Sequence, residues 1–117
     1  MNAVADCIFC KIVSKEIPSK VVYEDEQVLV FHDINPQAPT HLLVIPKEHI
    51  QSASHVTEEH KELLGQIFIV IKNVTEKLGL DKDGYRVVNN CGKLGGQQED
   101  HLHFHILGGR QMLWPPG

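Results

Sequence analysis

The sequence lacks the features that mark membrane proteins and nucleic-acid-binding proteins. Its longest apolar run covers residues 67–71, whereas a membrane span needs roughly 20 apolar residues. It has 11 basic and 15 acidic residues, and the resulting net charge of -4 argues against nucleic acid as a partner. Residues 1–6 have neither a basic stretch nor an apolar run of signal-peptide length, so a cytoplasmic location is expected. A chain of 117 residues suffices for one domain, over residues 1–117.

Cysteine is also scarce. The three cysteines are an odd number, so no disulfide framework is expected, and two of them form the C-x-x-C pair Cys7 and Cys10. Histidine, in contrast, is abundant, with eight residues in this short chain. The functional prediction therefore depends on where the histidines and the cysteine pair lie.

The hydrophobic pattern predicts an α+β domain. Apolar residues recur at three- and four-residue steps between Thr57, a suitable N-cap, and Gly79, a suitable C-cap, which predicts one long amphipathic helix. A short helix is expected over residues 7–13, with Asp6 as its N-cap. Five segments have strand character, and their arrangement indicates an antiparallel sheet: residues 21–24, 28–31, 41–45, 85–89 and 101–107.

Three histidines alternate with apolar residues in the last of these segments. In a strand, side chains two residues apart share a face and lie about 6.6 Å apart, so His101, His103 and His105 are expected to form one row. The residues between them are expected to face the core: Leu102, Phe104 and Ile106. Such a row suits metal ligation, and it also suits nucleophilic catalysis by one imidazole that its neighbours orient.

A glycine-rich loop directly precedes the histidines. Gly92, Gly95 and Gly96 allow the backbone to approach a ligand closely and to turn its amides toward an anion. A glycine-rich loop alone is weak evidence for a ligand site. Joined to three histidines, it favours a phosphate site over a bare metal site.

The cysteine pair is open to three interpretations: a redox motif, half of a zinc site, or a coincidence. The thioredoxin type of redox motif requires a βαβ setting, which the sequence does not predict. Spacing alone does not identify further metal ligands.

Several segments resemble the histidine triad (HIT) family and, within it, the Hint branch. They are HLHFHIL at 101–107, GGRQMLWPPG at 108–117, FHDINPQAPTH at 31–41 and IPK at 45–47. This resemblance spans nearly the whole chain. It implies a HIT-like fold of about five antiparallel strands with one long and one short helix, and a homodimer that binds purine nucleotides.

The resemblance also implies an activity. The expected reaction is hydrolysis of adenosine or guanosine 5′-phosphoramidates through a nucleotidyl-histidine intermediate on His103. His105 and His41 are then expected to contact the phosphate and help to protonate the leaving amine, and His101 to orient its neighbours. The implied nucleotide contacts are Asn90, Gly96 and Gln97 for the phosphate and Phe31, Asp33 and Ile34 for the nucleoside, with Trp114 reaching the partner subunit's site.

Some relatives, including bacterial members of the wider family and the galactose-1-phosphate uridylyltransferases, hold a structural zinc ion. The residues that match their ligands are Cys7, Cys10, His49 and His101. No organic cofactor is expected.

This chain departs from the animal Hint pattern just before the triad. Gln98 replaces a serine, and Glu99 and Asp100 replace an apolar residue and a tyrosine. Three alternative functions stay open: a dinucleoside polyphosphate hydrolase, a non-enzymatic nucleotide-binding or adaptor protein, and a metal carrier that uses the whole histidine row.

Overall fold

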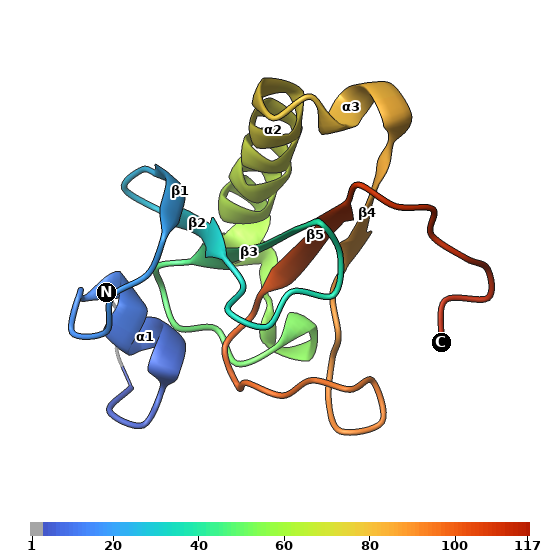
Figure 1. Ribbon diagram of the computed structural model, residues 1–117. Coiled ribbons are helices and arrows are strands. Elements are labelled where there is room, and N and C mark those ends of the chain that lie inside the picture. The colour runs from blue at the N-terminus through green and yellow to red at the C-terminus, as the bar shows by residue number, and fades with distance from the viewer. Residues whose placement is uncertain (1–3) are drawn as a thin grey trace.

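A five-stranded antiparallel sheet forms the centre of the fold in the computed structural model, which describes residues 4–117 (Figure 1). The strand order is β1-β2-β3-β5-β4, so β3 lies in the middle. The strands are β1 Val21–Glu24, β2 Val28–His32, β3 Thr40–Pro46, β4 Tyr85–Val88 and β5 Phe104–Gly108. The predicted α+β class and the antiparallel sheet are confirmed.

Helices cover both faces of the sheet (Figure 1). The long helix α2, Lys61–Lys77, packs on one face, and the short helix α1, Ile8–Val13, packs on the other. The single-turn helix α3, Leu80–Asp83, and two 3-10 turns, Ala53–His55 and Glu58–His60, add to the two helices that the sequence predicts. Among residues 4–117, no helix is both long and apolar enough to cross a bilayer.

Strand β3 is apolar on both faces because it lies between these two layers. Leu42 and Val44 belong to the core under α2, and Leu43 and Ile45 belong to the smaller core under α1. Successive side chains of a strand point to opposite faces, so a strand covered on both sides needs a continuous apolar run. The run over residues 41–45 therefore reflects the central position of β3.

The helix ends differ in part from the prediction. Asp6 is not the N-cap of α1; Cys7 is, and its Sγ accepts a hydrogen bond from the Cys10 amide at 3.2 Å. Thr57 caps the 3-10 turn Glu58–His60, and the α-helix begins only at Lys61. Gly79 follows the end of α2 in the left-handed conformation, with φ of 75°, as expected for a helix-ending glycine.

The prediction of a strand over residues 101–107 is wrong for its first three residues. Strand β5 begins at Phe104, because His101 and Leu102 bond to the last residue of β3 and to the chain beyond it rather than in the ladder between β3 and β5. The Leu102 amide donates to the Ile50 carbonyl at 2.6 Å, and His101 Nε2 donates to the Pro46 carbonyl at 2.8 Å. His101 is thereby removed from the expected row of histidines.

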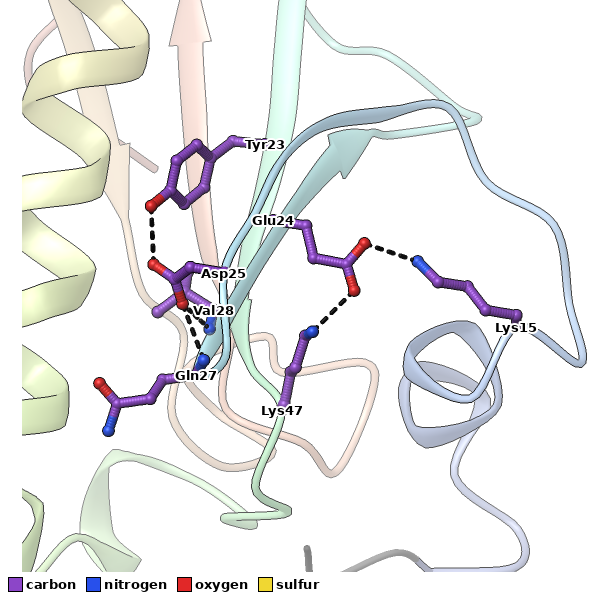
Figure 2. Close-up of polar contacts among 7 residues, drawn as sticks. All are labelled: Lys15, Tyr23, Glu24, Asp25, Gln27, Val28 and Lys47. Carbon is purple, nitrogen blue, oxygen red and sulfur yellow. Dashed lines mark hydrogen bonds and ion pairs between the residues drawn. The ribbon is translucent and has the colours of Figure 1, made fainter.

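Ion pairs hold α1 near the end of β3. Figure 2 shows the Glu24 carboxylate between two ammonium groups, 2.8 Å from Lys15 and 2.6 Å from Lys47. Hydrogen bonds with these groups lower the pKa of Glu24. Lys15 follows α1 and Lys47 follows β3, so Glu24 joins the two segments that carry the cysteine pair and His49.

We expect the face of β3 that packs under α2 to contribute much of the stability of the fold. Leu42 is fully buried, and Leu42→Ala should lower the free energy of unfolding by about 2–5 kcal/mol through lost burial and a cavity. The control Leu94→Ala removes the same atoms from a fully exposed side chain and should cost less than about 0.5 kcal/mol. Urea unfolding curves measure both values, and equal losses would contradict this assignment of the core.

Candidate functional site

A cavity of about 550 Å³ opens between α1, β2, the segment after β2 and the glycine-rich loop. It brings together residues that are far apart in the sequence. Its apolar lining comes from α1 and the sheet: Ile8, Phe9, Ile12, Phe31 and Leu43. The residues predicted to contact a nucleotide that line it are Phe31, Asp33, Ile34, Asn90 and Gly96, together with His103 and His105. The cavity therefore combines apolar side chains with polar and histidine side chains.

A backbone carbonyl sets the tautomer of His103. Nδ1 of its ring lies 2.7 Å from the carbonyl oxygen of His101. A carbonyl can only accept, so Nδ1 carries the hydrogen, and the neutral ring has its lone pair on Nε2. His103 is 5% exposed, and its ring packs edge-on against Phe9, with ring centroids 5.1 Å apart. His103 is thus held in the form that a nucleophile requires.

A second chain of hydrogen bonds sets the tautomers of His41 and His105. The Gln37 amide donates to His41 Nδ1 at 3.0 Å, so the hydrogen of the neutral His41 ring is on Nε2. That nitrogen lies 2.8 Å from His105 Nδ1 and donates to it. The hydrogen of His105 is therefore on Nε2, and His105 lines the cavity as a hydrogen-bond donor.

Burial keeps both of these rings neutral. It lowers the pKa of His41, and the nearby Asp33 carboxylate opposes the shift only in part. Burial lowers the pKa of His105 to about 4, and the neighbouring His103 and His41 rings act in the same direction. A neutral donor, not a resident imidazolium, therefore stands next to His103.

The group Asp33, His41 and His105 has ligand atoms close enough to surround a metal ion. Its hydrogen bonds oppose that use. A metal on His41 Nε2 would force the ring hydrogen onto Nδ1, where it would meet the Gln37 amide hydrogen. The 2.8 Å contact between the two rings is a hydrogen bond, and the two histidines are best described as a hydrogen-bonded chain with fixed tautomers.

A second group, Cys7, Cys10, His49 and His101, suits a metal much better. All four ligand atoms lie within 4.8 Å of one another, and they supply two sulfurs and two imidazole nitrogens. His101 donates from Nε2 to the Pro46 carbonyl at 2.8 Å, which leaves Nδ1 free and directed at the cysteines. Tetrahedral structural zinc sites use this donor set and this kind of outer contact. The sequence-predicted ligand set is therefore brought together.

The protonation of this group also fits metal binding. Burial raises the pKa of the Cys7 thiol to about 11 and lowers that of His101 to about 4. In the absence of a metal, the Cys7 thiol and the His101 ring are thus neutral. A bound divalent ion would displace the thiol protons, so its affinity should fall at low pH.

His101 contributes both to the cysteine-histidine group and to the cavity that contains His103. Its side chain belongs to the cysteine-histidine group, and its carbonyl sets the tautomer of His103. The expected row of three histidines is therefore reduced to a pair, His103 and His105, whose ring centroids are 5.1 Å apart.

Three residues predicted to contact the nucleotide do not line the cavity: His41, Gln97 and Trp114. The Gln97 side chain serves the loop itself: its Nε2 donates to the Gln51 and Glu99 carbonyls, and its Oε1 accepts from the Gly92 amide. Trp114 is 82% exposed on the C-terminal segment. Sequence reasoning missed the Gln37 amide and the Pro46 carbonyl, because a backbone group has no sequence signal.

Comparison with known proteins agrees with this geometry. The model of the HIT domain family matches residues 14–112. The chain belongs to the HIT domain family. The resemblance described above is confirmed at the level of the family, while membership of the Hint branch stays a prediction.

Individual HIT relatives are similar over most of this chain. A 14 kDa zinc-binding protein of Zea mays is 57% identical over 112 residues, which cover 94% of this chain and 87% of that protein. The crystal structure of a HIT family hydrolase from Legionella pneumophila matches with a TM-score of 0.94 at 53% identity, over 96% of this chain and 100% of the other. A histidine triad nucleotide-binding protein from Candida albicans matches with a TM-score of 0.81 at 36% identity, over 94% and 83%.

We expect the His105 ring to stay neutral far into the acid range. Its pKa lies at about 4 in the folded chain, against 6.5 for the ordinary group. The unfolded chain takes up this proton first, so the stability contribution is complete above pH 6.5 and is lost as the pH falls through 4.

Nitrogen-15 NMR of the histidine rings over this pH range checks both the tautomer and the pKa. In His105→Gln, the free energy of unfolding should fall less steeply between pH 6.5 and 4 than in the wild type. A midpoint for His105 above pH 6 would contradict the hydrogen-bond chain.

Proposed function

We propose that this HIT protein hydrolyses adenosine or guanosine 5′-phosphoramidates through a covalent nucleotidyl group on His103. The observation that carries the proposal is the bond from His103 Nδ1 to the His101 carbonyl, because it leaves a lone pair on Nε2 of a cavity-lining ring. The similar HIT family hydrolase and nucleotide-binding protein support a hydrolytic reaction and a nucleotide substrate.

The reaction takes two displacements at phosphorus. In the first, the Nε2 lone pair of His103 forms a bond to the α-phosphorus while the P–N bond to the amine breaks. The bonding electron pair stays on the amine nitrogen, which takes a proton from water. In the second, water attacks phosphorus, the bond to Nε2 breaks, and a nucleoside 5′-monophosphate leaves while a proton returns to solvent.

His105 acts in this scheme as a donor to a phosphoryl oxygen. Its Nε2 hydrogen stabilises the charge that develops in the transition state, and His41 holds its tautomer. Family resemblance implies that both rings also help to protonate the amine. The bond from the Gln37 amide favours the hydrogen-bonding role, because it leaves His41 no site for an extra proton.

The remaining contacts with the nucleotide are assigned to residues that line the cavity. Phe31, Asp33 and Ile34 line the part assigned to the nucleoside, with the Asp33 carboxylate accepting from ribose hydroxyls. Asn90 and Gly96 line the part assigned to the phosphate. Gln97 then acts by shaping the loop, and Trp114 is assigned to the partner subunit's site.

The charges of the cavity favour a phosphoramidate over a dinucleoside polyphosphate. Within the described part of the chain, no lysine or arginine lines the cavity, whereas two carboxylates, Asp33 and Glu99, do. A phosphoramidate monoester brings one negative charge, and a polyphosphate chain brings several that would lack a cationic partner. This difference supports the phosphoramidase over the dinucleoside polyphosphate hydrolase.

We further propose that Cys7, Cys10, His49 and His101 bind zinc. Four protein ligands leave no open position, so the ion would be structural. Bound there, zinc would crosslink α1 to the segment after β3 and to the residues before β5. The zinc-binding protein of Zea mays, 57% identical to this chain, supports the choice of metal.

The homodimer is also part of the proposal. Strand β4 lies at the end of the sheet, and among the described strands only β5 pairs with it. Phe68 and Ile69 expose about half of their surface on α2, at 52% and 53%. A free strand edge together with exposed apolar side chains is suited to joining two copies of one chain.

His103→Ala should abolish turnover of a tryptamine adenosine phosphoramidate, with a loss of at least about 10³-fold, since it removes the nucleophile. Intact-protein mass spectrometry after brief mixing should show a nucleotidyl adduct on the wild type only. His60→Ala, which changes a histidine outside the cavity, is the control and should release amine.

The outcomes of this experiment separate the candidate functions. Tight binding of the nucleotide without release of amine by the wild type would favour the non-enzymatic alternative. Equal release by His103→Ala would exclude His103 as the nucleophile. Native spectra of the same samples report whether the protein is a dimer.

Cys7→Ser should lose the metal, because it removes one of two thiolate ligands. Zinc content after dialysis should fall from about one ion per chain to below about 0.1, as expected for loss of a thiolate from a four-ligand site. Cys91→Ser is the matched control, since Cys91 lies outside the group, and it should keep its zinc. Zinc retained in Cys7→Ser, or lost from all triad variants alike, would contradict a structural site and favour a metal carrier.

A further inference from the structure

Glu99 is a charged residue of the cavity that the proposed reaction leaves unused. It lines the same cavity as His103 and His105. Its backbone is held in place, because Gln97 Nε2 donates to its carbonyl at 2.9 Å. Within residues 4–117, no hydrogen bond or ion pair joins the Glu99 carboxylate to another side chain or to the backbone. Its negative charge is therefore available to a ligand.

The position of Glu99 in the cavity assigns it to one part of a substrate. Helix α1, β2 and the segment after β2 supply the lining assigned to the nucleoside, including Phe31 and Asp33. The glycine-rich loop supplies the lining assigned to the phosphate, and Glu99 belongs to this part of the lining. With the α-phosphorus assigned to His103, the part of the substrate beyond the P–N bond is assigned to the loop.

We propose that Glu99 makes this protein selective for phosphoramidates whose leaving amine carries a second, cationic group. This inference rests on the proposed function. An ammonium or guanidinium group on the amine substituent would meet the Glu99 carboxylate, and within the described chain no lysine or arginine of the lining competes for it. The substrate would then have its anion at the histidines and its cation at Glu99.

The charge on the amine substituent is the same in the ground state and in the transition state. Its attraction to Glu99 is therefore uniform binding, which lowers KM and leaves kcat nearly unchanged. Because Glu99 is exposed, salt screens the attraction. A split between KM and kcat and a dependence on ionic strength are effects that a purely structural role of Glu99 would not produce.

The test compares two adenosine 5′-phosphoramidates that differ only in the end group of the amine. One carries 1,5-diaminopentane and the other hexylamine, so an ammonium group replaces a methyl group at the same chain length. At low salt, the wild type should have a kcat/KM about three- to tenfold higher for the diamine substrate, mostly through KM. At 0.5 M salt, the ratio should approach about one.

Variants of the two neighbouring acidic residues then test whether Glu99 causes the difference in kcat/KM between the substrates. Glu99→Gln should bring the low-salt ratio to about one, and Glu99→Lys should invert it, since the charge is removed and then reversed. Asp100→Asn is the matched control, because it removes the neighbouring carboxylate, which does not line this cavity, and it should keep the wild-type ratio.

The outcomes separate this inference from the function on which it rests. A ratio of one in the wild type, or a ratio that Glu99→Gln leaves unchanged, overturns the selectivity while both substrates are still cleaved. Equal loss of the ratio in Asp100→Asn and Glu99→Gln also overturns the role of Glu99. Cleavage of neither substrate by the wild type overturns the proposed function itself.

Discussion

Residues 101–103 run outside the sheet because the Leu102 amide and the His101 ring bond to the chain at and beyond the end of β3, and both candidate sites depend on this path. The Leu102 amide donates to the Ile50 carbonyl, and His101 Nε2 donates to the Pro46 carbonyl. These bonds turn the His101 ring toward Cys7 and Cys10 and point its carbonyl at His103. The proposed metal ligand and the tautomer of the proposed nucleophile His103 thus both depend on His101.

Backbone groups, rather than charged side chains, determine the tautomers of the histidines in the site. The His101 carbonyl and the Gln37 amide each have a single hydrogen-bonding role, so the tautomers of His103 and His41 follow without ambiguity. The His41 ring passes this constraint on to His105. Bonds to the folded backbone orient these rings before any ligand binds.

Low charge is the second characteristic of the site. Burial holds His41 and His105 neutral, and the cavity has carboxylates without lysine or arginine among the described residues. Such a cavity suits a ligand with a single negative charge that is met by oriented donors. The same property gives an exposed carboxylate such as Glu99 more influence, since no nearby cation neutralises it.

The sequence determined the elements and the chemistry of the residues. The apolar run of β3, the spacing of α2 and the alternation around Phe104 are local patterns, and each predicted the presence of its element, although not where α2 and β5 begin. The closeness of the Cys7 and Cys10 side chains follows from their spacing of three residues, about one helical turn. Resemblance to the HIT family supplied His49 and His101, which spacing did not identify.

Only the tertiary structure decided how the histidines divide between the two sites. Strict alternation predicts one row, but local propensity does not register the bonds to Ile50 and Pro46, about 50 residues earlier in the chain. The tautomers likewise depend on backbone groups that come close only after folding. The Gln97 side chain bonds to the Gln51 carbonyl rather than lining the cavity for the same reason. Residue type determines which chemistry is available, and long-range hydrogen bonds determine which atom performs it.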